Sequence, residues 1–128
     1  MENLEISGTS KIPTINFNAN TGILLIKGKS ILDNASDFYL PIINWLIEYS
    51  ACPQPKTILN IDLEYFNTSS SKCILHIFRK LETIAQNNVE VSIQWFYNAD
   101  DVDMLEAGEN YESIINVPFH LTAHSKAI

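Results

Sequence analysis

The chain lacks several features that common functional classes require. Its 128 residues contain no apolar run of the ~18 or more residues that a membrane-spanning helix needs. The first five residues are acidic and have no apolar core, unlike a signal peptide. Cations are few: 8 Lys and Arg against 15 Asp and Glu give a formal net charge of −7, which repels nucleic acids and anionic lipids. These features predict a cytoplasmic protein that binds no nucleic acid and does not insert into membranes.

Glycine, cysteine and catalytic side chains are also sparse. None of the four glycines belongs to a Walker-type phosphate-binding loop, so no nucleotide cofactor is predicted. Cys52 and Cys73 have no metal-ligand spacing, and we expect two buried free thiols in a reducing compartment. His76, His120 and His124 are far apart, with no nucleophile or acid at a known catalytic spacing. These residues therefore indicate no known catalytic site, and we predict no cofactor or metal site from them.

Apolar residues make up 46% of the chain, enough for the core of one ordinary domain. Alternating apolar residues and turn signals predict four strands, at residues 14–18, 22–28, 57–66 and 89–97. Residues 114–121 are either a fifth, short strand at an edge or an extended tail. Helical periodicity predicts three helices: one capped by Asp33 or Asn34, one after a hydroxyl-rich stretch and stopped at Asn87-Asn88, and one at 102–109, ended early by Gly108. Pro41 should kink the first helix or mark its regular start near Leu40.

The strands at 57–66 and 89–97 are apolar on one side only. Their other sides carry polar residues: Asn60, Asp62, Glu64, Glu90, Ser92 and Gln94. A sheet with helices on both faces would have nearly continuous apolar strands. The sequence predicts an α/β fold, a single domain over 13–121 with a mixed four- to five-stranded sheet and helices mainly on one face. Residues 1–12 are predicted as a flexible lead-in and 122–128 as a tail.

Four consecutive hydroxyl residues, Thr68 to Ser71, join the strand at 57–66 to the second helix. Hydroxyls favour helix starts because they accept from the unpaired N–H groups of the first turn, but one or two would suffice. The same N–H groups and the helix dipole favour a phosphate. Lys72 follows at once; it opposes the dipole but suits a phosphate on a neighbouring hydroxyl. We predict a regulated, phosphorylatable strand-to-helix corner.

Three further clusters have two interpretations each. Asp100, Asp101 and Asp103 could bind a metal, although an acidic helix start explains them better because a calcium loop from Asp101 would have Glu106 where glycine is needed. The strand-face pair Asp62 and Glu64 could serve acid–base work, although a solvated sheet face is the commoner case. Strand alternation puts Phe66 and Phe96 together on the polar side, and Tyr65 with Leu63 on the apolar side. The two phenylalanines could form an exposed patch for a partner or be buried under the third helix.

The segment Leu63-Glu64-Tyr65-Phe66-Asn67-Thr68-Ser69-Ser70-Ser71-Lys72 resembles the signature of the SiaC family of bacterial regulatory phosphoproteins. Phe38-Tyr39-x-Pro41, Trp95-Phe96-Tyr97 with the following acidic segment, and Pro118-Phe119 extend the resemblance over about residues 12–121. It implies a fold similar to the STAS domains of anti-anti-sigma factors. It also implies a protein without enzymatic activity. The phosphoacceptor implied is the threonine of the Asn-Thr-Ser-Ser segment, which is Thr68 here. Ser69, Ser70 and Ser71 are the alternative acceptors.

The resemblance further implies three protein partners. The unphosphorylated protein is expected to bind and activate a diguanylate cyclase, and so to act in cyclic di-GMP signalling and biofilm formation. A partner protein kinase would release the cyclase by phosphorylating Thr68, and a PP2C-type phosphatase would restore binding. The partner-binding candidates are Glu64, Tyr65, Phe66, Asn67, Ser69, Ser70 and Lys72. The alternatives are an anti-anti-sigma-like antagonist of another effector and a small acidic metal-binding protein or enzyme.

Overall fold

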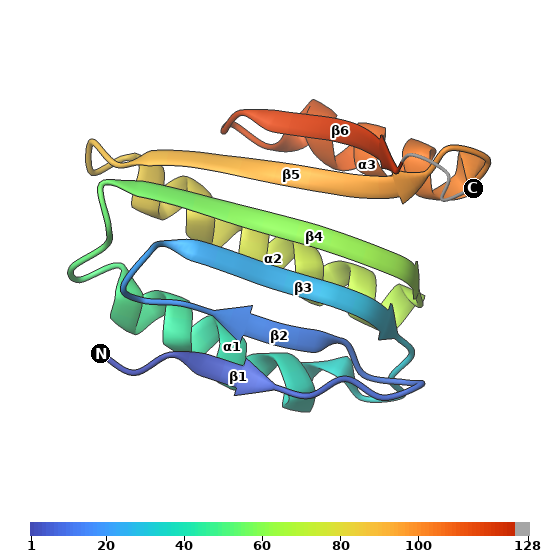
Figure 1. Cartoon of the computed structure of the whole chain (residues 1–128), viewed down its shortest axis with the longest axis horizontal. Helices are drawn as coiled ribbons and strands as arrows, with labels where there is room; N and C mark the ends of the chain where they lie inside the picture. The colour runs from blue at the N-terminus through green and yellow to red at the C-terminus, as the bar shows by residue number, and fades with distance from the viewer. Residues whose placement is uncertain (125–128) are drawn as a thin grey trace.

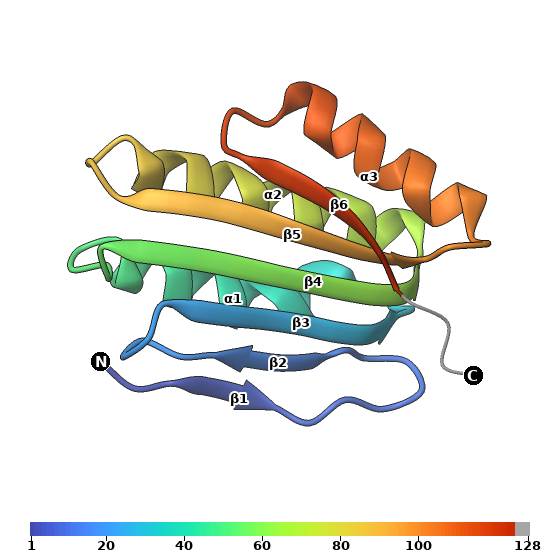
Figure 2. The same cartoon turned by 45° about the horizontal axis from the view of Figure 1, so that its top comes forward.

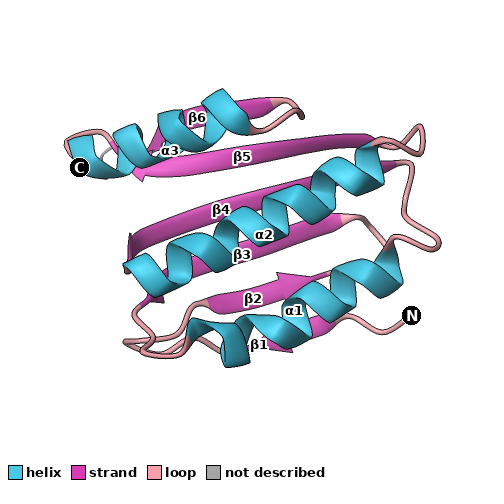
Figure 3. Ribbon diagram, turned by 180° about the vertical axis from the view of Figure 1, so that it is seen from behind, coloured by secondary structure: helices cyan, strands magenta, loops and turns pink. Residues whose placement is uncertain are grey.

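A six-stranded sheet covered on one face by three helices makes up the computed structural model, which describes residues 1–124 (Figures 1 and 3). The strands are β1 (Leu4–Ile6), β2 (Thr14–Phe17), β3 (Ile23–Ser30), β4 (Lys56–Phe66), β5 (Glu90–Asn98) and β6 (Phe119–His124). The helices are α1 (Ala35–Tyr49), α2 (Thr68–Ala85) and α3 (Val102–Ile114). The predicted α/β fold with one-sided helices is confirmed.

The strands lie side by side in their sequence order, from β1 to β6. The pairs β1–β2 and β2–β3 are antiparallel, whereas β3, β4, β5 and β6 are parallel and point the same way in Figure 2. Each parallel connection carries one helix, and all three helices pack on the same face (Figure 3). The carboxyl ends of β3 to β6 therefore share one edge of the sheet, and the start of α2 lies at that edge.

Strand alternation decides which face is buried. In β4, Leu59, Ile61 and Leu63 are buried against the helices, while Asn60 and Asp62 on the opposite face are partly exposed. The same alternation in β5 buries Trp95, which contacts the rings of Phe78 and Phe119. A face that carries polar side chains on its central strands stays uncovered, as Figure 1 shows from that side.

The two ends of the sheet correct the predicted boundaries. Leu4–Ile6 is strand β1, paired with β2, although the sequence predicted a lead-in without a strand. The indole of Trp45 donates to the Glu2 carbonyl at 2.9 Å, which ties this segment to α1. At the other end, β6 runs to His124, into the predicted tail, and residues 125–128 lie outside the described range. The sheet gains its sixth strand from β1, a three-residue segment too short to show a pattern.

Three further predictions can be compared with the structure. Helix α1 runs from Ala35 through Pro41 to Tyr49, so its regular part begins well before Leu40. The prediction of buried thiols is wrong, because Cys52 is exposed and Cys73 only partly buried. Asn88, placed at the stop of the second helix, does adopt a left-handed conformation with φ of +61°, just beyond α2.

Gly108 does not end α3, which continues for two further turns to Ile114. The residue is buried, and a Cβ there would lie 2.6 Å from the Trp95 ring and 2.7 Å from Leu121. The Trp95 indole also donates to the Met104 carbonyl at 3.1 Å, which draws the helix onto the ring. The sequence suggested a helix stop, but the glycine serves the close packing of α3 on the sheet.

Gly108→Ala is therefore expected to destabilise the fold, although alanine is the better helix former. Helix propensity alone would favour alanine by about 1 kcal/mol, and overpacking against Trp95 and Leu121 costs about 1–3 kcal/mol. We expect a net loss near 1 kcal/mol in the free energy of unfolding, measured by urea denaturation. Glu112→Ala, at an exposed position of the same helix, is the control and should change stability little. A stabilised Gly108→Ala protein would contradict this packing argument.

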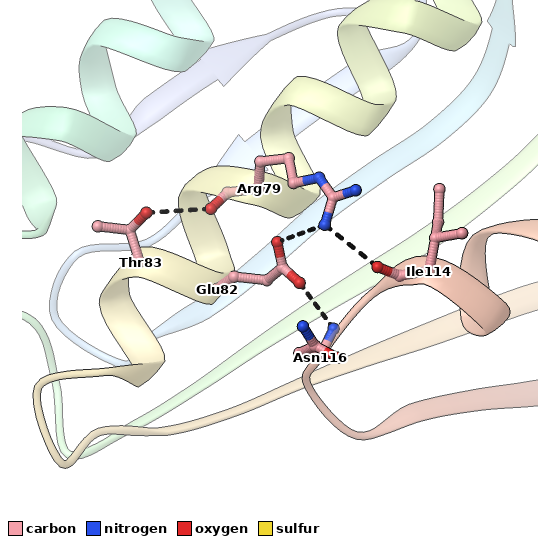
Figure 4. A network of polar contacts seen from close by, with 5 residues as sticks. All are labelled: Arg79, Glu82, Thr83, Ile114 and Asn116. Atoms are coloured by element: carbon pink, nitrogen blue, oxygen red, sulfur yellow. Dashed lines mark hydrogen bonds and ion pairs between the residues drawn. The ribbon is translucent and has the colours of Figure 1, made fainter.

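A polar network joins the second half of α2 to the segment between α3 and β6 (Figure 4). Arg79 donates to the Glu82 carboxylate at 2.9 Å and to the Ile114 carbonyl at 3.1 Å. The Asn116 N–H donates to the other Glu82 oxygen at 2.7 Å. Burial opposes ionisation of Glu82, but the Asn116 N–H and the Arg79 guanidinium outweigh it, and the pKa of Glu82 is lowered.

This network predicts a pH-dependent stability difference for Glu82→Gln. A carboxyl whose folded pKa is lowered contributes stability above its unfolded pKa, and loses it as the pH falls through the folded value. The variant should therefore be less stable than the wild type by about 1 kcal/mol at pH 7, and the difference should shrink below the ordinary value of 4.5. Urea denaturation at several pH values measures it. A difference that stays constant down to pH 3 would exclude ionised Glu82 as its source.

Candidate functional site

The hydroxyl corner, defined here as Thr68 to Ser71 with their cap Asn67, lies where β4 passes into α2 at the carboxyl edge of the sheet. The cap is Asn67 and not one of the four hydroxyls. Its Oδ1 accepts from the Ser70 N–H at 3.1 Å, and its Nδ2 donates to the Leu32 carbonyl at 2.8 Å. Because one asparagine both caps α2 and holds the β3–α1 loop, capping does not explain the four hydroxyls.

Ser70 is a buried structural residue with an exposed fraction of 0%. Its hydroxyl donates to the Ser30 carbonyl at 3.0 Å and accepts from the Ser30 hydroxyl at 2.7 Å. The Ser30 hydroxyl has one proton, and it donates that proton to Ser70. The Tyr39 hydroxyl lies 2.7 Å from Ser30 Oγ and is therefore the donor in the hydrogen bond between Tyr39 and Ser30. Burial raises the pKa of Tyr39 to about 12, against the opposing effect of its bond to Ser30, so Tyr39 stays a neutral donor. The chain Tyr39–Ser30–Ser70 joins α1, β3 and α2.

Ser69 and Ser71 are partly buried and bonded within the protein. The Ser69 hydroxyl accepts from the Ala35 N–H at 3.2 Å, so the start of α2 helps to cap α1. The Ser71 hydroxyl donates to the Thr68 carbonyl at 2.7 Å. The Tyr111 hydroxyl donates to the Ser71 carbonyl at 2.8 Å, and burial raises the pKa of this tyrosine. Both serine hydroxyls therefore have structural partners.

Thr68 differs from the three serines. It is exposed, and its hydroxyl makes no hydrogen bond with another group of residues 1–124. It is the first residue of α2, where N–H groups and the helix dipole favour negative charge. Lys72 is exposed one turn later, at the i+4 position on the same face of the helix. Of the predicted acceptors, Thr68 is the one whose hydroxyl is open to solvent and free of a protein partner within the described chain.

A register shift in β4 rearranges the residues just before the corner. Gly28 of β3 pairs with Leu63, but the next residue, Lys29, pairs with Tyr65, so Glu64 is an extra residue in β4. The extra residue reverses the alternation that the sequence suggested. Tyr65 points to the open face, and Phe66 packs towards the helices with ring centroids 6.0 Å from Trp95 and 6.4 Å from Tyr111.

The predicted patch of Phe66 and Phe96 does not form. Phe66 is partly buried among the rings on the helix side, whereas Phe96 stacks on His124, on the open face, at a centroid distance of 5.5 Å. In the sequence, Gly28 was a possible sign of the irregularity, because glycine readily adopts a positive φ. In the structure, Gly28 has a φ of +119° and lies at the register shift. Sequence analysis also missed Ser30 and Tyr39, which no local pattern links to the corner.

The acidic residues do not form a metal site in the part of the chain that the structure describes. Asp101 caps α3 by accepting from the Met104 N–H at 3.0 Å, as an acidic helix start requires. Asp62 pairs with His124 at 2.7 Å. Asp62, Glu64, Asp100 and Asp101 line one hollow of about 580 Å³ on the open face, but residues 1–124 contain no group of three His, Cys, Asp or Glu side chains able to hold an ion.

The predicted partner-binding residues separate into two groups. Glu64, Tyr65 and Lys72 are exposed. Phe66, Asn67 and Ser69 are partly buried with contacts inside the protein, and Ser70 is fully buried. Among the described residues, no helix is long and apolar enough to cross a membrane. The exposed residues around the strand-to-helix corner are thus Glu64, Tyr65, Thr68 and Lys72.

The family model that matches this chain is one of regulatory phosphoproteins, a class in which a phosphorylated side chain controls contacts with other proteins. The chain belongs to the SiaC family of regulatory phosphoproteins, whose family model matches residues 6–124.

Individual relatives agree with this assignment. An uncharacterized protein of Pseudomonas aeruginosa strain UCBPP-PA14 is 30% identical over 126 residues, 98% of this chain and 100% of the relative. The crystal structure of apo-SiaC from Pseudomonas aeruginosa is 31% identical and superposes with a TM-score of 0.88, covering 96% of this chain and 100% of that one. A third match, at 30% identity and a TM-score of 0.88, covers 94% of this chain and 99% of the other. It comes from the crystal structure of the diguanylate cyclase SiaD in complex with its activator SiaC from the same species.

Proposed function

We propose that this protein is a cytoplasmic, phosphorylation-controlled binding switch for a diguanylate cyclase, with Thr68 as the phosphoacceptor. The unphosphorylated form binds and activates the cyclase, a partner kinase phosphorylates Thr68 and so releases it, and a PP2C-type phosphatase restores binding. The protein acts by binding and not by catalysis. The observation that carries the proposal is the exposed Thr68 hydroxyl at the start of α2, which has no hydrogen-bond partner within residues 1–124, beside three serines with internal partners. The role of SiaC as activator of SiaD supports the choice of effector.

The corner can accept a phosphoryl group without losing its own structure. Thr68 makes no side-chain hydrogen bond within residues 1–124 that phosphorylation would break, whereas a phosphoryl group on Ser70 would have to enter the core. The added charge of about −1.5 to −2 lies at the positive end of the α2 dipole. Lys72, on the same helix face, can pair with it. We therefore expect the phosphorylated domain to remain folded.

Phosphorylation would act on the partner through the surface around Thr68. Glu64, Tyr65, Thr68 and Lys72 are exposed and close to one another in the sequence, and a partner that covers them must remove water from them. A dianion in the middle of such an interface keeps its hydration unless the partner supplies cations, and like charges on the partner repel it. The loss of binding therefore needs no conformational change in the domain.

The rate of cyclic di-GMP formation tests this function. A diguanylate cyclase of the host is assayed alone, with the unphosphorylated protein and with the protein phosphorylated at Thr68. We expect the unphosphorylated protein to raise the rate and the phosphorylated protein to leave it near the basal value. Glu82→Gln, near the opposite end of α2 from Thr68, is the matched control and should activate like the wild type. Equal activation by both forms of the wild type would contradict the proposal.

A further inference from the structure

Tyr65 is the one aromatic side chain among the large apolar residues that are exposed in the part of the chain described, with an exposed fraction of 53%. The other rings on the strands are at most partly exposed: Phe66 and Trp95 pack on the helix side, and Phe96 stacks on His124. An aromatic ring left in water beside otherwise polar neighbours forgoes the stabilisation that its burial would bring.

The backbone irregularity of β4 accounts for this exposure. With regular alternation, Tyr65 would follow Leu63 into the core, and Phe66 would point to the open face. The extra residue Glu64 exchanges the sides of the sheet to which Tyr65 and Phe66 point. Gly28 of β3, with a φ of +119°, lies opposite the register shift. Bulges occur next to functional sites because they redirect a side chain. Here the redirected side chain is a tyrosine on the edge of the sheet that carries the hydroxyl corner.

Tyr65 is also close enough to Thr68 to share its interface. They are three positions apart in the sequence, and an extended chain spans at most about 3.6 Å per residue, so their Cα atoms lie within about 11 Å. One side of a standard protein interface covers about 800 Å², which includes both positions. Lys29 pairs with Tyr65 across β3 and β4, and Glu64 precedes it, so the ring has charged neighbours. Tyrosine is enriched among the residues that dominate the binding energy of protein interfaces, so an exposed tyrosine at this position is a candidate hot spot.

We infer that Tyr65 anchors the cyclase complex by inserting its ring into an apolar pocket on the diguanylate cyclase, with Lys29, Glu64 and Thr68 around it. This inference rests on the proposed function. It adds Tyr65 as the residue that supplies much of the energy of binding to the cyclase. Phosphorylation of Thr68 then places its charge at the border of the anchor, where water must be excluded. Because the contact is apolar, it acts on the lifetime of the complex more than on the rate of encounter.

The test measures binding of unphosphorylated protein to a purified host diguanylate cyclase by surface plasmon resonance. Tyr65→Ala should weaken binding at least tenfold, mainly through faster dissociation, whereas Tyr65→Phe, which keeps the ring, should stay within about threefold of the wild type. Ile47→Ala on the outer side of α1, where Ile47 is 50% exposed, is the matched control and should bind like the wild type. Thermal melts establish that the variants are folded.

The possible failures can be told apart. If the wild type binds no host diguanylate cyclase, the proposed function fails, and the inference fails with it. If the wild type binds and Tyr65→Ala binds within about twofold of it, the inference alone is overturned. Equal losses in Tyr65→Ala and Ile47→Ala would also overturn it, because the loss would then be a general effect of removing exposed apolar groups.

Discussion

Stoichiometric phosphorylation of Thr68 should lower the affinity for the diguanylate cyclase at least 100-fold. That change corresponds to about 2.8 kcal/mol, since each tenfold step is about 1.4 kcal/mol. The physical reason is the cost of removing water from a dianion on the exposed Thr68, which lies in the sequence between the exposed Tyr65 and Lys72. Isothermal titration of the cyclase with phosphorylated and unphosphorylated protein measures the two dissociation constants.

Two controls make this result specific. Thr68→Ala removes the phosphoacceptor, but the Thr68 hydroxyl makes no hydrogen bond within residues 1–124 that would be lost. The variant should therefore bind the cyclase within a few-fold of the wild-type affinity. Its free energy of unfolding should lie within about 0.5 kcal/mol of the wild-type value. Thermal unfolding of the phosphorylated protein should show that the domain is intact. Loss of cyclase binding together with loss of the folded state would mean that phosphorylation acts by unfolding, contrary to this account.

Ser70→Ala should destabilise the protein by about 2 kcal/mol, the second large effect. The substitution leaves the Ser30 carbonyl without the hydroxyl donor at 3.0 Å and the Ser30 hydroxyl without its acceptor at 2.7 Å. Ser70 is fully buried, so water cannot replace these contacts, and a buried polar group without a partner costs about 1–3 kcal/mol. Urea denaturation measures the loss.

The neighbouring serine provides the matched control. Ser71→Ala removes one bond, to the Thr68 carbonyl at 2.7 Å near the surface, and should cost no more than about 0.5 kcal/mol. If Ser70→Ala is as stable as Ser71→Ala, the Tyr39–Ser30–Ser70 chain does not hold the corner, and the argument that Ser70 is structural loses its basis.

The one-sided sheet could be predicted because alternation is local. Polar residues at every second position of β4 and β5 require an uncovered face, whatever the rest of the chain does. The reversal at Tyr65 and Phe66 could not be predicted in the same way. A single extra residue leaves no mark on a pattern of alternation, and it becomes visible only when β4 is paired with β3.

The position of the hydroxyl corner in the chain could be predicted from the sequence, but the hydrogen bonds inside it could not. Asparagine, serine and threonine all cap helices, so the sequence alone does not select Asn67 from five neighbouring candidates. The burial of Ser70 depends on Ser30 and Tyr39, which come from other elements. Gly108 was misread for the same reason, because the ring that packs on it belongs to β5.

The central claim is that Thr68 is the residue modified in the cell. Phosphosite mapping by mass spectrometry, on protein purified from growing and from starved host cells with phosphatases inhibited during lysis, tests it most directly. The account predicts phosphate on Thr68, in an amount that changes between the two conditions, and none on Ser70. Phosphate confined to Ser69 or Ser71, or no phosphate in either condition, would contradict it.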